Sequence, residues 1–202
     1  VVHNPVDVQL FNYVEKPPEQ RKKILSIRPF ASRQYANDLT VKAILELSKE
    51  SFFDQLEFRV IGDGVLFDET VEPLLNFENV VVEKRFLTHQ QIASLHKEYG
   101  IFLCPTRWDS QGVSRDEAMA SGLVPVTTAV AAIPEFADEQ CAGLVPAEDH
   151  VALAREVARL VNDEHLFLMK SRNAQQRVRV QSASPLITAQ EVGLFSRSVA
   201  RQ

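Results

Sequence analysis

Glycine, cysteine and long apolar runs are all scarce in this chain of 202 residues, and each shortage excludes a class of protein. The 7 glycines are about half of the average share, so the position of each glycine is informative. The 2 cysteines, Cys104 and Cys141, cannot build a disulfide framework, and no CxxC or Cys/His metal spacing occurs. Both lie in or beside apolar runs, so we expect them to be core thiols in a reduced compartment.

Basic residues are also in deficit, because 22 Lys and Arg face 27 Asp and Glu for a net charge of −5. This balance argues against a nucleic acid or an anionic membrane as the main partner. No span approaches the roughly 18 apolar residues that cross a bilayer. The opening Val1–Pro5 lacks the regions of a signal peptide, so we expect a cytoplasmic protein. A hydrophobic fraction of 45% is ordinary for a globular chain with a sizeable core.

Short apolar runs alternate with helical patterns along most of the chain. The runs are mostly apolar, as expected of strands buried on both faces of a parallel sheet. They cover residues 23–28, 56–61, 79–83, 101–104, 124–127 and 142–145. The helical patterns cover residues 38–49, 66–75, 89–99, 114–121 and 151–161. Thr88 and Gln91 have the spacing of a capping box at the start of the third helix.

This alternation predicts an α/β, Rossmann-like, three-layer domain with a parallel sheet of about six strands and helices on both faces. Such a sheet binds ligands at the carboxyl ends of its strands. We expect residues 1–22 to be an interdomain linker, residues 23–171 to form the domain and residues 172–202 to form a C-terminal helical extension. The extension carries five arginines against one acid, which predicts a solvated helix face or, as the alternative, contact with an acidic partner.

Several catalytic motifs are missing. The first strand ends Ile27-Arg28-Pro29-Phe30 with no G-x-G-x-x-G, and no P-loop occurs, which disfavours a nicotinamide enzyme and a P-loop ATPase. No G-x-S-x-G elbow and no His-x-x-x-His pair occurs. His89 and His96 are seven positions apart without further ligands between them, so we expect surface histidines and no metal site.

The most informative stretch is residues 104–122, which leaves a buried strand, crosses a loop and opens a helix near Ser114. Gly112 lets a ligand approach the backbone, and the helix's first free N–H groups suit an anion such as a diphosphate. Asp109 in the loop and Glu117 in the helix can flank one ligand and accept hydrogen bonds from sugar hydroxyls. The alternative, equally open from these residues alone, is that Asp109 caps the helix and Glu117 is a surface acid.

The order Pro-Thr-x-x-Asp-x-x-Gly-x-x-x-x-Glu-Ala-Met-Ala-x-Gly-x-x-Pro-Val in this stretch resembles the E-x7-E region of family 4 glycosyltransferases. The resemblance implies a retaining, metal-independent enzyme of the GT-B fold, in which two Rossmann-like domains face each other across a cleft. Three further segments resemble the C-terminal domain of that family, namely Val2–Asp7 with Phe11, Val60–Gly64 and Val80–Leu87.

The resemblance assigns donor binding to ten positions. Glu117 matches the glutamate that holds the ribose hydroxyls, and Asp109 stands where the first glutamate contacts the donor sugar. Arg28 occupies the position of the cation that neutralises the leaving diphosphate. The loop between the two carboxylates contacts the sugar or diphosphate through Ser110, Gln111, Gly112, Val113 and Ser114, and the base lies against Phe86 and Leu87.

Three positions depart from the family pattern. Asp109 is one methylene shorter than the usual glutamate, and Asn4-Pro5 replaces Asn-Gly. The family's Lys-Gly after the first strand is Tyr35-Ala36, so the second diphosphate cation is missing. Arg33 can replace it, because guanidinium binds phosphate oxygens in a bidentate way, and a surface role for Arg33 is equally open.

The resemblance therefore implies that the chain is the donor-binding half of a glycosyltransferase of polysaccharide biosynthesis. Its substrate is a nucleotide-diphosphate sugar, its acceptor is a glycan or lipid-linked saccharide, and no cofactor or metal is expected. The partner is an N-terminal acceptor-binding domain, without which we expect no turnover, and the full-length protein can make a peripheral membrane contact. The alternative is a non-catalytic nucleotide-sugar or partner-binding domain of the same fold. A response-regulator-like domain is disfavoured, because the first strand ends Arg28-Pro29 rather than in a cluster of acids.

Overall fold

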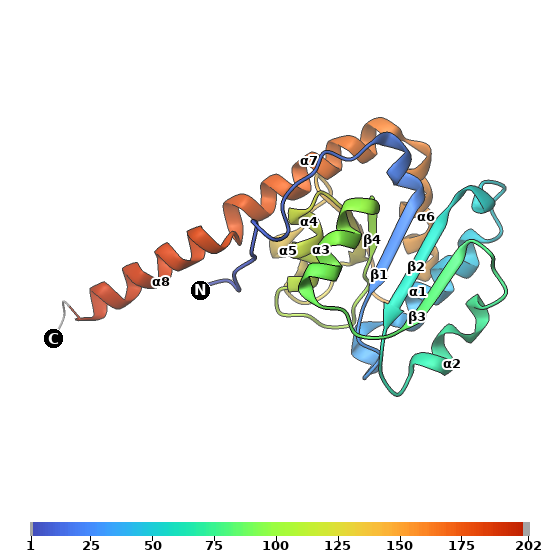
Figure 1. Ribbon diagram of the computed structural model, residues 1–202, viewed down its shortest axis with the longest axis horizontal. Coiled ribbons are helices and arrows are strands. Elements are labelled where there is room, and N and C mark those ends of the chain that lie inside the picture. Colours follow the sequence, from blue (N-terminus) through green and yellow to red (C-terminus); the bar gives the residue numbers. More distant parts are fainter. Residues whose placement is uncertain (1, 200–202) are drawn as a thin grey trace.

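The structure is a computed structural model that describes residues 2–199, and its centre is one parallel sheet of six strands. The strands lie in the order β3-β2-β1-β4-β5-β6 (Figure 1). Strands are added toward one edge of the sheet from β1 to β3 and toward the other edge from β4 to β6, so the strand order reverses between β1 and β4. Their bounds are β1 Lys23–Ile27, β2 Glu57–Gly62, β3 Val80–Lys84, β4 Ile101–Leu103, β5 Val124–Thr128 and β6 Gly143–Val145. The α/β, Rossmann-like sheet with helices around it confirms the fold predicted from the apolar runs.

Helices connect the strands and cover both faces of the sheet (Figure 1). Their bounds are α1 Asn37–Leu47, α2 Phe67–Val71, α3 His89–Glu98, α4 Val113–Ala120, α5 Ile133–Phe136, α6 His150–Asn162, α7 Glu164–Gln181 and α8 Ser184–Val199. The predicted capping box is present, because Thr88 Oγ1 accepts from the Gln91 N–H and the Gln91 side chain accepts from the Thr88 N–H.

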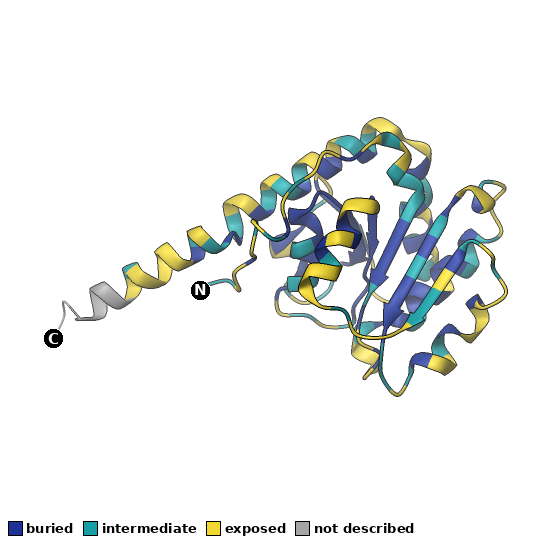
Figure 2. Cartoon of the chain, viewed as in Figure 1, coloured by how far each residue is buried: buried dark blue, intermediate teal, exposed yellow. Residues whose placement is uncertain are grey.

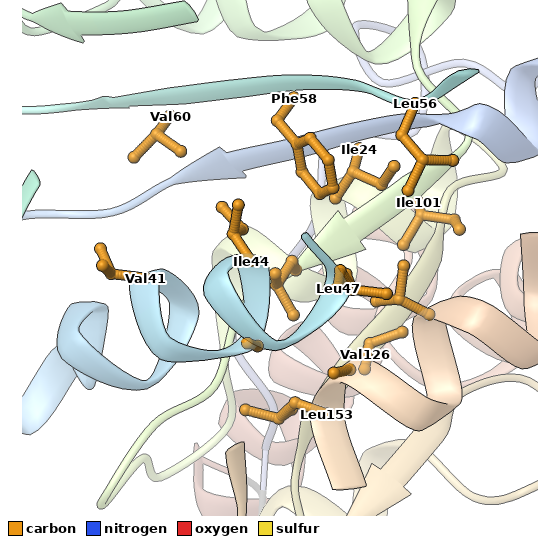
Figure 3. Packing of buried hydrophobic residues seen from close by; sticks show 14 of the residues in the cluster. Ile24, Val41, Ile44, Leu47, Leu56, Phe58, Val60, Ile101, Val126 and Leu153 are labelled. Carbon is orange, nitrogen blue, oxygen red and sulfur yellow. The ribbon is translucent and has the colours of Figure 1, made fainter. Parts of the chain in front are cut away.

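Alternate residues of the central strands β1, β2 and β4 enter two different cores, because successive side chains of a strand point to opposite faces. Ile24, Phe58 and Ile101 join the side chains of α1 and α6 in the larger cluster (Figure 3). Leu25 and Phe102 point to the other face and pack against α3 and α4. The two cores together fix the carboxyl ends of the strands, where the candidate site lies.

The chain passes along α7 before it enters the sheet. Val6 forms a parallel bridge with Ala183 at the end of α7, and a 3-10 helix, Pro18–Lys22, then leads into β1. The boundary expected between residues 171 and 172 falls inside α7, and the division into domains stays a prediction. Beyond α7, α8 projects away from the sheet and is largely exposed over its described side chains (Figure 2). Of the residues described, none lie in a helix long and apolar enough to cross a membrane.

One expectation about histidine is wrong. His89 is exposed, but His96 is fully buried and packs against Phe11 and Phe102. Burial lowers the pKa of His96 to about 3, helped by the nearby Lys16 ammonium, whose Nζ donates to the His96 carbonyl. The pattern of α3 alone did not reveal this burial, because the covering residues come from the segment before β1. Cys104 and Cys141 are both buried free thiols, as expected.

Candidate functional site

The candidate site lies where the strand order reverses, between the carboxyl ends of β1 and β4. Arg28 directly follows β1, and residues 104–112 follow β4 and lead into α4. In open α/β sheets this crevice is the usual ligand position, because the two connections leave it toward opposite faces. We call residues 109–114 the 109–114 loop, since they lie between the strand and the body of α4.

The start of α4 offers backbone donors. Gly112 is its N-cap, with a φ of +85° that favours glycine, and no side chain makes a capping hydrogen bond there. The first N–H groups of a helix have no partner within it, and the helix dipole adds positive potential at this end. The turn at Gly112–Ser114 is therefore suited to an anion.

Arg28 brings a guanidinium to the same turn. The side chain is 6% exposed, and its Nη1 donates to Ser114 Oγ at 3.1 Å. The Tyr35 ring lies 5.2 Å from its Cζ, so the residue that replaces the expected lysine stacks on the remaining cation. Among the described residues, Arg28 Nε has no hydrogen-bond partner although it is buried. A buried donor without a partner is costly, which makes Arg28 a strong candidate for holding an anion.

The two carboxylates are held differently. Asp109 Oδ1 accepts from the Gln111 N–H at 3.2 Å, which closes a local turn in the loop. Glu117 is half-buried on α4, and burial raises the pKa of its carboxyl while the nearby His89 opposes the shift. Neither carboxylate caps α4, since its cap is Gly112. His89, at the start of α3, is a neighbour of Glu117 that the sequence did not assign to the site.

Arg33 faces a different cavity. Its exposed side chain lines a space of about 720 Å³ between α1 and α2, together with Lys42 and Arg107. Arg107 there is paired with Asp38 at 2.8 Å and with Glu148 at 2.7 Å. Over residues 2–199, no hydrogen bond or ion pair joins Arg33 to Arg28 or to the 109–114 loop, and the Arg33 carbonyl accepts from Arg107 Nη1 instead.

The other predicted contacts are exposed to different degrees. Phe86 is 76% exposed on the connection after β3, while Leu87 packs against the core under α3 and α4. Ser110 is exposed, and Val113 and Ser114 are half-buried. Gln111 is 3% exposed, so its side chain points into the interior and only its backbone is available to a ligand.

The sequence analysis missed two charged residues beneath the loop. Arg115 and Asp116 are each 2% exposed and form an ion pair, with Arg115 Nη2 2.7 Å from Asp116 Oδ1. Their helical spacing from Ala118, Met119 and Ala120 places them on the buried side of α4, which was the available signal. Among the described residues no group of three or more His, Cys, Asp or Glu side chains could hold a metal ion.

The family described as "Glycosyl transferases group 1" matches residues 21–163. The comparison with curated proteins returned no match. The fold is similar to that of sucrose-phosphate synthase from Thermosynechococcus elongatus, with a TM-score of 0.83, 18% identity and coverage of 100% of this chain and 53% of that chain.

Two further solved structures are similar at low identity. One is a TarM mutant from S. aureus in complex with fondaparinux, alpha-GlcNAc-glycerol and UDP, with a TM-score of 0.80, 18% identity and coverage of 96% of this chain and 39% of that one. The other is the C-terminal domain of the group 1 protein LpcC from Francisella tularensis, with a TM-score of 0.74, 20% identity and coverage of 89% and 99%. The chain thus spans 53% of sucrose-phosphate synthase and 39% of TarM, but nearly all of the isolated C-terminal domain of LpcC.

Proposed function

The chain belongs to the group 1 glycosyl transferases, and we propose that within this family it is the donor-binding half of a family 4 type enzyme. In this proposal the full-length protein transfers a sugar, with retention, from a nucleotide-diphosphate sugar to an acceptor glycan or lipid-linked saccharide. The UDP in the similar TarM structure supports a nucleoside diphosphate as the common part of the ligand.

The observation that carries the proposal is the pairing of Arg28 with the uncapped start of α4 through Ser114. The difficulty in sugar transfer is the negative charge that builds on the departing diphosphate. Fixed donors aimed at that charge lower the barrier, because they need no reorganisation when it appears. Arg28 and the amides of Gly112, Val113 and Ser114 supply such donors from the protein itself, which supports a metal-independent reaction.

The remaining groups fit the rest of the donor. We assign the ribose hydroxyls to Glu117, the sugar to Asp109 and Ser110, and the base to Phe86 and Leu87. Arg33 is not part of this set, because its side chain lines the cavity between α1 and α2. The Gln111 side chain is likewise buried, so we assign only its backbone to donor binding.

The half-enzyme role is supported by length. The chain spans 53% of sucrose-phosphate synthase and 99% of the LpcC C-terminal domain. We therefore propose that a separate acceptor-binding domain completes the cleft and that this chain alone binds donor weakly without turning it over. A cytoplasmic location and a peripheral membrane contact of the full-length protein stay predictions.

Calorimetric titration of the chain with UDP, GDP, ADP and dTDP, and with their sugars, tests the proposal. At least one nucleoside diphosphate should bind, and Glu117→Gln should weaken it about tenfold by removing an acceptor for the ribose hydroxyls. Glu50→Gln is the matched control, because Glu50 is exposed and precedes the amino end of β2 on the opposite edge of the sheet. Equal affinities for wild type and Glu117→Gln would contradict the assignment.

A non-catalytic nucleotide-sugar or partner-binding domain is the second candidate. The observation in its favour is Tyr35, whose ring stacks on Arg28 where the family carries a lysine. The two candidates separate in the full-length protein, where an enzyme consumes its nucleotide sugar in the presence of acceptor. Restoring the cation with Tyr35→Lys should raise turnover of an enzyme and leave a non-catalytic domain inactive.

A further inference from the structure

The 109–114 loop is fastened from beneath by one buried carboxamide. Gln111 Oε1 accepts from the Asn4 N–H at 2.7 Å, and Gln111 Nε2 donates to the Asn4 carbonyl at 3.0 Å. The same Nε2 donates to Asp116 Oδ2 at 3.1 Å. One side chain thus satisfies both backbone groups of a residue from the segment that enters the domain, and joins them to α4.

The Arg115–Asp116 ion pair holds this carboxamide from the other side. Asp116 Oδ1 accepts from Arg115 Nε at 3.1 Å and from Nη2, and Nη2 also donates to the Gln111 carbonyl. A Cβ at Gly112 would lie 3.1 Å from Arg115 Nη1, so the guanidinium lies directly under the N-cap of α4. A buried ion pair rarely adds net stability, so its presence here calls for another role.

The entering segment is itself anchored next to this pair. The His3 ring packs edge-on against Phe136 with centroids 4.8 Å apart, and the Arg115 guanidinium lies 5.7 Å from the same ring. His3 Nδ1 lies 3.1 Å from the Gln181 carbonyl at the end of α7. Segment, loop and α7 therefore meet in one cluster, in which Gln111, Arg115 and Asp116 are buried while His3 is half-buried and Asn4 is exposed.

We infer that Gln111, Arg115 and Asp116 are positioning residues, which hold the 109–114 loop in the shape that receives the donor sugar and couple that shape to His3–Asn4. This inference rests on the proposed function. These side chains are at most 3% exposed, so they act through the loop rather than by touching the donor. The link to the sugar is Asp109, whose Oδ1 is held by the Gln111 N–H.

Because the effect passes through the loop, the sugar and the diphosphate should respond differently. The diphosphate retains Arg28, whose backbone directly follows β1, although its Nη1 also reaches Ser114 Oγ. The sugar depends on Asp109 and Ser110, which lie entirely within the loop. A loosened loop should therefore lower the affinity for a nucleotide sugar more than the affinity for its nucleoside diphosphate. General destabilisation of the domain would weaken both alike.

The first test separates positioning from stability. Arg115→Met/Asp116→Leu replaces the buried pair by apolar side chains, which often leaves stability unchanged or raised. We expect an unchanged or higher melting temperature, about a tenfold weaker affinity for UDP-glucose and less than about a threefold change for UDP. If the nucleotide panel selects another base, that diphosphate and its glucose derivative are the probes. A parallel change in both affinities, or none in either, would overturn the inference.

The second test addresses the coupling to the entering segment. Asn4→Pro removes the N–H that Gln111 accepts from, whereas Asn4→Ala leaves both backbone bonds in place and is the matched control. We expect Asn4→Pro and Gln111→Leu to lower the affinity for the nucleotide sugar to a similar extent. The double variant should lose no more affinity than either single variant. Additive losses, or wild-type affinity in Asn4→Pro, would refute the coupling.

A readout without ligand keeps this inference separate from the proposed function. In Gln111→Leu, amide hydrogen exchange should accelerate in both residues 2–6 and residues 109–114, while β1 and β4 keep their protection. If no nucleotide binds the wild-type chain, the proposed function fails and the exchange result alone decides the inference. Faster exchange confined to the loop would contradict the coupling to His3–Asn4.

Discussion

Two buried regions beside β1 and β4 differ in polarity, because one consists of apolar side chains and the other of polar and charged ones. The cluster under α1 and α6 consists of apolar side chains such as Ile24, Ile44 and Phe58, nearly all fully buried (Figure 3). The cluster beneath the 109–114 loop consists of Gln111, Arg115 and Asp116, joined by hydrogen bonds. The first stabilises the fold through apolar burial that any similar side chains could supply. The second depends on specific donors and acceptors, so it selects one loop shape.

The largest expected effect comes from opening the apolar cluster. Phe58→Ala removes a ring that is 1% exposed and should lower the free energy of unfolding by about 3–5 kcal/mol. Urea denaturation followed by circular dichroism measures this loss. Val81→Ala on the exposed side of β3 is the control and should cost less than about 1 kcal/mol. An equal loss of unfolding free energy at Phe58 and Val81 would contradict the assignment of Phe58 to the core.

A second prediction breaks the polar cluster unevenly. Asp116→Ala leaves the Arg115 charge buried without its partner, which costs about 3–5 kcal/mol in other buried pairs. The Arg115→Met/Asp116→Leu variant removes both charges and should be far more stable than Asp116→Ala in the same urea titration. If the single and double variants were equally unstable, the pair would act as ordinary packing rather than as matched charges.

A third prediction uses a buried lysine in the segment that precedes β1. Burial lowers the pKa of Lys16 from 10.5 to about 8, so the folded state favours the neutral amine. Below pH 8 the buried ammonium costs about 3 kcal/mol, and this cost disappears as the pH rises from 8 toward 10.5. Lys16→Met should therefore exceed wild type in unfolding free energy at pH 7, and the difference should shrink above pH 8. A difference that stays constant with pH would contradict the burial of a charged Lys16.

A fourth prediction compares the two arginines after β1. Arg28→Gln should lower the affinity for UDP about tenfold and the affinity for UMP less, because the guanidinium pairs with the diphosphate, whose second phosphate UMP lacks. Arg33→Gln should leave both affinities near wild type, since Arg33 faces the cavity between α1 and α2. Calorimetry on the two variants measures the contrast. A larger loss in Arg33→Gln would restore it as the missing diphosphate cation.

The same contrast explains what the sequence predicted. Short apolar runs predicted all six strands, and helical periodicity predicted α1, α2, α3, α4 and α6. The short α5 was not predicted, since four residues carry no period. The Glu164 start of α7 was not predicted either. The polar cluster was beyond prediction because Gln111 bonds to backbone groups of Asn4, 107 positions away, which no local pattern encodes. The burial of His96 was missed for the same reason.

The central claim is that a nucleoside diphosphate binds at the start of α4 between Arg28 and the two carboxylates. Titration of the isotopically labelled chain with UDP, or with the diphosphate that the panel selects, tests it by backbone amide chemical shifts. We expect the largest shifts at Gly112, Val113 and Ser114, because the N–H groups of these residues would donate to the diphosphate. Shifts concentrated instead on Arg33 and Lys42, in the cavity between α1 and α2, would contradict it.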